Sequence, residues 1–170
     1  MKMESMVFSQ CRRMIMVMLL AALGMAATAC EKEEGDVIIN TAIELRFTDA
    51  IGHNLLDPAT PNAFSQEEIE LYYLVNGERK LTLDGSLDYP KHFFVFQAGT
   101  QHIMRLFPSL HEENMRTQTY IRLSETDTDT ISCAIKRWGK GNQSAAVTKV
   151  WYNNELVWEG TGPRYVEVVK

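Results

Sequence analysis

The sequence predicts an all-β domain. Between residues 37 and 170, short apolar segments recur, and several of them alternate strictly between apolar and polar side chains. Turn-forming residues separate the segments roughly every 8–12 positions, and no stretch has the apolar periodicity of a long helix. We count about nine strands, which is typical of an antiparallel, immunoglobulin-like β-sandwich. A closed β-barrel is the alternative, because the sequence does not tell whether the sheet edges meet.

The first strong strand signal covers residues 43–48, where apolar and polar residues alternate. Residues 37–39 are a short candidate strand before it. A long loop over residues 49–66 follows, rich in glycine, proline, asparagine and aspartate. Its Leu55 and Leu56 are expected to pack back onto the sheet, and a loop of this length in a compact domain is often functional.

Residues 69–75 and 79–83 are predicted to pair as a hairpin, because an Asn-Gly turn at 76–77 lies between them. A two-residue loop would set Leu81 beside Tyr72, whereas a three-residue loop keeps odd positions opposite odd ones. We expect the three-residue loop, with its glycine left-handed, because it collects the apolar side chains of both strands on one face.

The second half of the chain adds further short strands. The predicted segments are residues 93–96, 103–107, 119–123, 130–138, 147–152, 155–159 and 165–169. Residues 93–96 are apolar at every position, which predicts a strand buried on both faces. Around the Asn153-Asn154 turn, a two-residue loop would pair Trp151 with Leu156 and Lys149 with Trp158.

Residues 1–29 have the composition of a secretory leader. A basic flank precedes an apolar run, residues 14–25, that is too short to span a membrane. Small residues, Ala27 to Ala29, then precede Cys30, and this ending resembles the lipobox of bacterial lipoproteins, with Ala27 where that family usually has Leu. The resemblance implies cleavage before Cys30 and anchoring in outer-membrane lipid through acyl chains on Cys30. An ordinary secreted protein cut after Ala29 and a retained signal anchor are the alternatives.

A charged tether follows the cysteine. Lys32, Glu33 and Glu34 resemble the surface-export signal of Bacteroidetes lipoproteins, which implies that the domain faces the cell exterior; a solvated acidic linker is the alternative. We therefore divide the chain into a signal peptide over 1–29, a lipid-anchored tether over 30–41 and a single β-sandwich domain over 42–170.

Charge and cysteine content narrow the function further. The chain has a formal net charge of −5, which argues against a nucleic-acid partner, because such proteins carry basic patches. Of the three cysteines, Cys11 lies in the leader and Cys30 is the lipidation candidate. Cys133 is left without a partner for an internal disulfide, and its phase with Ile131 and Ile135 predicts a small, buried apolar side chain.

No catalytic motif is found, so we predict that the protein is not an enzyme and needs no cofactor. The four histidines lack the spacing of a zinc motif, and there is no nucleophile elbow or phosphate-binding loop. A hydrolase whose active site forms only on folding is the alternative. Asp49, Asn54 and Asp57 supply hard oxygen donors around Gly52 and are weak Ca²⁺ candidates, since such residues more often form local turns.

Aromatic residues are the remaining binding candidates. Tyr72, Trp138, Trp151 and Trp158 could offer flat rings to a sugar or a partner protein. The alternative is that Trp151 and Trp158 fill the core of the sandwich.

Taken together, the leader, the acidic tether and the segments 46–58 and 71–77 resemble small uncharacterised surface lipoproteins of gut Bacteroidetes, whose domain has no known function. The resemblance implies no catalytic residue. We therefore expect a non-catalytic module that binds a glycan or an outer-membrane partner. The alternative is a structural or assembly subunit of a surface complex or pilus.

Overall fold

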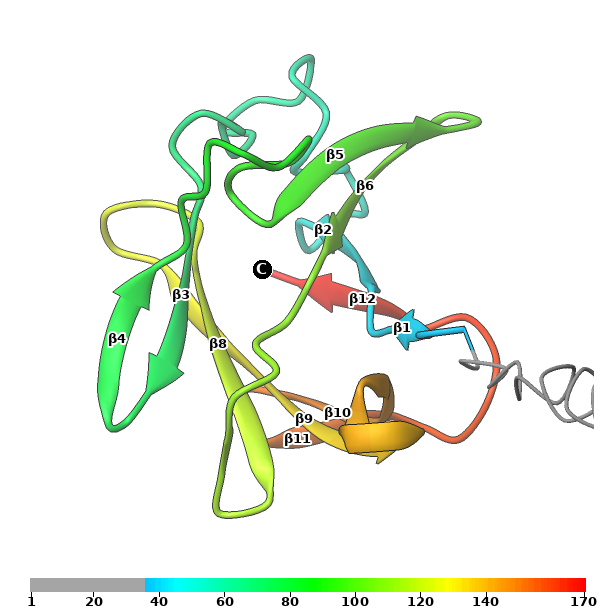
Figure 1. Cartoon of the computed structure of the whole chain (residues 1–170). Coiled ribbons are helices and arrows are strands. Elements are labelled where there is room, and N and C mark those ends of the chain that lie inside the picture. Colours follow the sequence, from blue (N-terminus) through cyan, green and yellow to red (C-terminus); the bar gives the residue numbers. More distant parts are fainter. Residues whose placement is uncertain (1–35) are drawn as a thin grey trace, which may run out of the picture. The chain divides into compact units, whose positions relative to one another are not determined.

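A computed structural model describes residues 36–170, in which two β-sheets face each other (Figure 1). The predicted leader, the lipidation candidate Cys30 and the predicted export signal Lys32, Glu33 and Glu34 lie outside the described residues. Among residues 36–170, no helix is long and apolar enough to cross a membrane.

The larger sheet has the strand order β1-β10-β9-β8-β3-β4, with β11 added to β10 and β7 added to β8. Its strands are β1 (Ile39–Asn40), β3 (Glu70–Val75), β4 (Glu78–Leu81), β7 (Glu112–Glu113), β8 (Arg116–Arg122), β9 (Thr128–Trp138), β10 (Ser144–Tyr152) and β11 (Glu155–Glu159). A short 3-10 turn, η1 (Lys140–Asn142), connects β9 to β10.

The smaller sheet has the order β12-β2-β6-β5. Its strands are β2 (Ile43–Thr48), β5 (Phe93–Ala98), β6 (Gln101–Leu106) and β12 (Tyr165–Val169). Neither sheet closes into a barrel, and the predicted all-β sandwich is confirmed. The prediction of purely antiparallel sheets is wrong: both sheets are mixed, because β1 pairs with β10 and β12 pairs with β2 in parallel.

The core lies between the inner faces of the sheets. Ile43, Leu45 and Phe47 of β2 are fully buried, as the alternation of this segment predicts. The long loop returns Leu55 and Leu56 to the same cluster, which confirms the prediction for both. The largest fully buried side chains from the other elements are Ile69, Leu71, Met104, Leu106, Ile121, Leu123, Ile131, Val147 and Val150.

Cys133 is fully buried in this core, as predicted from its phase. Burial raises the pKa of its thiol to about 12, because the charged thiolate is poorly solvated there. The side chain therefore acts as a small apolar residue.

The β3–β4 hairpin differs from the prediction. Tyr72 pairs with Leu81, and the loop has two residues, Asn76 and Gly77, both with positive φ. The predicted three-residue loop is wrong, because a type I′ turn matches the twist of the flanking strands. In this register the side chains of Leu81 and Leu83 remain exposed to solvent, by 50% and 68%.

The β10–β11 hairpin is predicted correctly at its turn and wrongly beyond it. Trp151 pairs with Leu156 as expected, but Trp158 lies opposite Val150 rather than Lys149. A bulge at Val157 causes the shift, because one extra residue in the strand moves the side chains that follow it to the other face of the sheet. Trp158 consequently packs against the core.

Strand β5 is one of the two edge strands of the smaller sheet, and the prediction that residues 93–96 are buried on both faces is wrong. Phe93 is buried, whereas Phe94 and Phe96 are only partly buried and alternate with the core-facing residues.

Candidate functional site

The aromatic residues predicted as binding candidates are not brought together. Tyr72, Trp138, Trp151 and Trp158 are each partly buried and belong to the larger sheet. The Trp151 ring is covered by the Arg116 guanidinium, 3.7 Å from the ring centre. The hydroxyl of Tyr72 donates to Glu70, which helps to lower the pKa of this carboxyl group.

The Ca²⁺ candidates hold local turns. The Asp49 carboxylate accepts from the backbone N–H groups of Ile51 at 3.0 Å and His53 at 2.8 Å. Asn54 Oδ1 accepts from the N–H of Leu56, and Asp57 Oδ1 accepts from the N–H of Ala59. Within residues 36–170, no cluster of three or more His, Cys, Asp or Glu side chains is placed to hold a metal.

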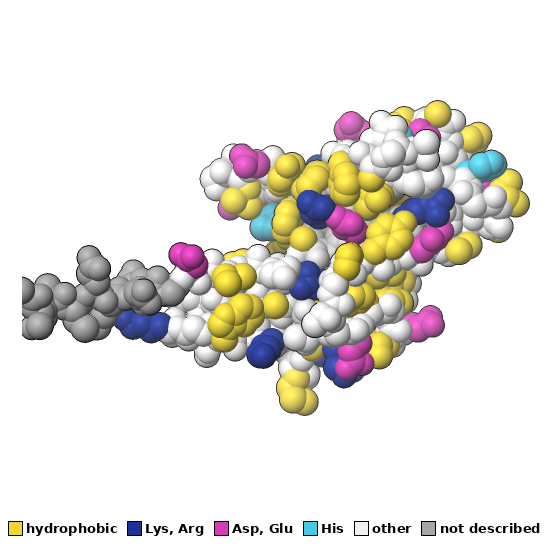
Figure 2. All heavy atoms as spheres, turned by 90° about the vertical axis from the view of Figure 1, so that its right-hand side faces the viewer, with side chains coloured by type: hydrophobic (Ala, Val, Ile, Leu, Met, Phe, Trp, Pro, Cys, Tyr) yellow, Lys and Arg dark blue, Asp and Glu magenta, His cyan; other side chains and the backbone are white. Residues whose placement is uncertain are grey.

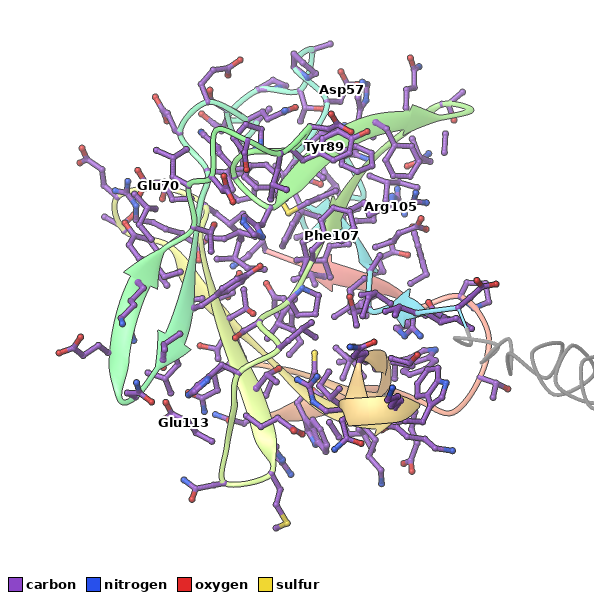
Figure 3. The ribbon with its side chains drawn as sticks, viewed as in Figure 1. Asp57, Glu70, Tyr89, Arg105, Phe107 and Glu113 are labelled. Atoms are coloured by element: carbon purple, nitrogen blue, oxygen red, sulfur yellow. The ribbon has the colours of Figure 1, made fainter. Side chains whose placement is uncertain are left out.

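A different set of aromatic residues gathers on the outer side of the smaller sheet. We call it the aromatic face; it consists of Tyr89, Phe94, Phe96 and Phe107. Tyr89 stacks on Phe94 with ring centres 4.0 Å apart, and Phe94 lies 5.8 Å from Phe96 and 6.4 Å from Phe107. Figure 3 shows Tyr89 and Phe107 close together beside β5 and β6. Tyr89 is 43% exposed, so the face is open to solvent.

Ion pairs border the aromatic face. Arg105 on β6 donates to the Glu44 carboxylate on β2, with its Nε at 3.1 Å, and its guanidinium lies 5.1 Å from the Phe96 ring centre. A second pair, Arg46 to Glu167 at 2.6 Å, follows toward β12. Figure 2 views the molecule from the right-hand side of Figure 1 and shows hydrophobic side chains interspersed with basic and acidic ones.

The strand register explains this arrangement. Phe94 lies opposite Arg105, Arg105 opposite Glu44, and Glu44 opposite Tyr165, so one row of side chains crosses all four strands. Directly opposed side chains in a sheet are close enough to touch. The row therefore has an aromatic ring at each end and the charged pair of Arg105 and Glu44 between them.

The link between β4 and β5 brings Tyr89 to the face. Asp84 accepts from the Ser86 N–H at 3.0 Å and from its hydroxyl at 2.6 Å, and these bonds lower the pKa of the Asp84 carboxyl group. The N–H of Asp84 donates to Pro90 and that of His92 donates to Tyr89. These bonds fold the link into a compact turn.

A small hollow of about 270 Å³ opens beside the rings. Its lining residues are Leu87, Asp88, Tyr89, His92 and Phe107. This volume is smaller than the ~300–1,000 Å³ of sites for drug-sized ligands, which suits one ring of a larger molecule.

The Nε2 atom of His92, a residue that lines this hollow, is available to bind a ligand there. Tyr73 donates its hydroxyl proton to the Phe107 carbonyl at 2.6 Å, so its oxygen can only accept from His92 Nδ1 at 3.0 Å. Nδ1 therefore carries a proton. No hydrogen bond within residues 36–170 engages Nε2, which can accept one when the ring is neutral.

The sequence contains a signal for part of this face. In residues 93–98, one phase of the period-two alternation holds Phe94 and Phe96, but the apolar run hides which phase faces out. Tyr89 lies in a turn-rich link, where no alternation of apolar and polar residues indicates which way its side chain points.

The fold and this face define an all-β sandwich with an exposed aromatic face bordered by ion pairs. Comparisons with protein-family models, with curated proteins and with solved structures find no match.

Proposed function

We propose that the protein is a lipid-anchored, non-catalytic module of the cell surface whose aromatic face binds a glycan. The observation that carries the proposal is the contact of Tyr89, Phe94, Phe96 and Phe107 on one open sheet face, next to the Glu44–Arg105 pair.

The chemistry of this face suits a sugar. The C–H faces of a sugar ring are apolar and pack on aromatic rings, while its hydroxyl groups need polar partners placed around the rings. Arg105 and Glu44 supply charged donors and acceptors on one side, and Asp88 and His92 supply others at the hollow. The aromatic face and the hollow share Tyr89 and Phe107, so one chain of sugar units would cover both.

The proposed location rests on the sequence. Lipidation of Cys30 and export directed by Lys32, Glu33 and Glu34 would hold the face outside the cell, where a glycan is available. Mass spectrometry of the mature N-terminus tests the lipid, and protease treatment of intact cells tests the exterior position. An unmodified Cys30, or a domain that resists protease until the cells are lysed, would contradict this part of the proposal.

A glycan array probed with the full chain tests the ligand class. We expect binding that falls about fivefold for Tyr89→Ala, because stacking on one ring contributes on the order of 1 kcal/mol. Trp151→Ala is the matched control, since this ring is also partly buried but lies on the larger sheet under Arg116.

Two outcomes would contradict the glycan proposal: an array without any bound glycan, or equal losses for Tyr89→Ala and Trp151→Ala. An empty array would favour the predicted alternative of an assembly subunit in a surface complex.

A further inference from the structure

The free edge of β5 differs from the other sheet edges. Among the described edge strands of four or more residues, β4, β11 and β12 each carry at least one charged side chain, whereas β5 carries none. Charged residues, prolines and bulges are the usual protection against pairing with another chain. Strand β5 has no proline, and its pairing with β6 runs through six residues without a bulge.

The hydrogen-bond pattern shows which backbone groups are open on this edge. The Phe107 N–H donates to the His92 carbonyl, and bonded pairs alternate along an antiparallel ladder, so Phe94 and Phe96 also point their backbone groups at β6. The N–H and C=O groups of Val95 and Gln97 point the opposite way. None of the hydrogen bonds outside the strand ladders within residues 36–170 involves these groups.

A groove runs along the same edge. It has a volume of about 660 Å³ and lies between β5 and the loop that follows β2. Val95, Phe96 and Gln97 of β5 line one side together with His102 of β6, and loop residues between Leu56 and Glu67 line the other. The loop forms the wall of the groove opposite β5.

The negative charge of Glu67 on the groove wall favours a partner segment that carries a basic side chain. Glu67 lines it, and hydrogen bonding from the Ser65 hydroxyl lowers the pKa of Glu67, so the carboxylate is charged at neutral pH. Among the described residues, no lysine or arginine lines the groove, and the imidazole of His102, which does line it, lies 3.8 Å from the Asp57 carboxylate. Lys91 lies nearby, but its ammonium group donates to the carbonyls of Gln66, Glu67 and Ile69.

We propose that this groove binds an extended segment of a partner protein, which adds as a strand to the free edge of β5 and places a lysine or arginine next to Glu67. Main-chain hydrogen bonds to Val95 and Gln97 hold the partner segment, and the groove contacts every second side chain of that segment. The inference does not rest on the glycan proposal, because it uses the backbone edge of β5 and the groove wall; of the aromatic face, the groove is lined by Phe96 and not by Tyr89, Phe94 or Phe107.

A library of random linear peptides displayed on phage, selected on the full chain, supplies the probe. Gln97→Pro removes one open N–H without touching the β6 ladder and should weaken the selected peptides about fivefold or more. Gln97→Ala is the matched control, since it removes the side chain and keeps the N–H. Glu67→Gln should weaken the peptides by up to about fivefold.

Amide hydrogen exchange gives a readout that does not depend on variants. Without peptide, the Val95 and Gln97 amides should exchange faster than those of Phe94 and Phe96, and a bound peptide should slow them. Equal binding by Gln97→Pro and wild type, a library without binders, or protection away from β5 would overturn the proposal. So would a dimer of the chain that Gln97→Pro abolishes, because the edge would then serve a second copy. Tyr89→Ala should leave peptide binding unchanged.

Discussion

Replacing Asp129 with alanine removes the acceptor that ties the two sheets together at one end of the core. Asp129 lies on β9 of the larger sheet and is only 4% exposed. Its carboxylate accepts from the Tyr152 hydroxyl, from Asn153 Nδ2 at 2.7 Å and from the ammonium group of Lys170, which directly follows β12 of the smaller sheet. The N–H of Lys170 also donates to the Thr48 carbonyl at 2.8 Å, which holds β12 against β2.

The expected cost follows from the groups left behind. Tyr152 is 9% exposed, so its hydroxyl would lose its acceptor without gaining full solvation, at about 1–3 kcal/mol. Removing one partner of a buried ion pair typically costs about 3–5 kcal/mol. Lys170 keeps Asp127 at 2.8 Å, which limits the total to that range. Since domains of this size have about 5–15 kcal/mol of stability, Asp129→Ala should remove a large fraction of it.

Urea denaturation followed by circular dichroism measures this loss. We expect a much lower midpoint with an unchanged slope, since the surface exposed on unfolding stays the same. Asp127→Ala is the control, because this carboxylate contacts Lys170 from a more exposed position and should cost less than about 1 kcal/mol. Equal midpoints for Asp129→Ala and Asp127→Ala would refute the reasoning.

Three further predictions concern the core and the larger sheet. Burial raises the pKa of Cys133 to about 12, so peptide mapping should find its thiol unmodified by alkylating reagents at pH 8 and fully modified in urea. Because the folded protein keeps this thiol neutral, the free energy of unfolding should fall as the pH rises above about 9. The hydroxyl of Tyr72 and the guanidinium of Arg122 lower the pKa of Glu70, so the contribution of this carboxylate to stability is present at neutral pH and is lost as the pH falls below about 4.5. In urea denaturation, the free energy of unfolding of Glu70→Gln should therefore change less than that of the wild type over this pH range, by under about 1 kcal/mol. Leu45→Ala should cost about 2–5 kcal/mol by urea denaturation, because this side chain is fully buried, and a cost under 1 kcal/mol would contradict its place in the core.

The core could be predicted from the sequence because alternation is a local property. Ile43, Leu45 and Phe47 share a face in any regular strand, and all three are fully buried. Leu55 and Leu56 were predictable as adjacent large apolar residues in a loop rich in turn-forming residues, whereas Ile51 of the same loop is 79% exposed. In both cases, burial of apolar area decides the outcome whatever the order of the strands.

The candidate site could not be predicted in the same way, because it depends on strand order and on single-residue irregularities. The apolar run at 93–96 has the composition of a central strand, yet β5 lies at an edge, which leaves Phe94 and Phe96 on an open face. The bulge at Val157 turns Trp158 toward the core, against which it packs. Tyr89 reaches the face through the hydrogen bonds of a turn, which have no periodic signal.

The most direct test of the glycan proposal is an NMR titration of the full chain with a glycan selected on the array. The aromatic face predicts saturation transfer from the ring protons of Tyr89 and Phe107 to the C–H groups of the sugar, with the Trp151 resonances unchanged. Transfer from Trp151, with none from Tyr89 or Phe107, would contradict the proposal.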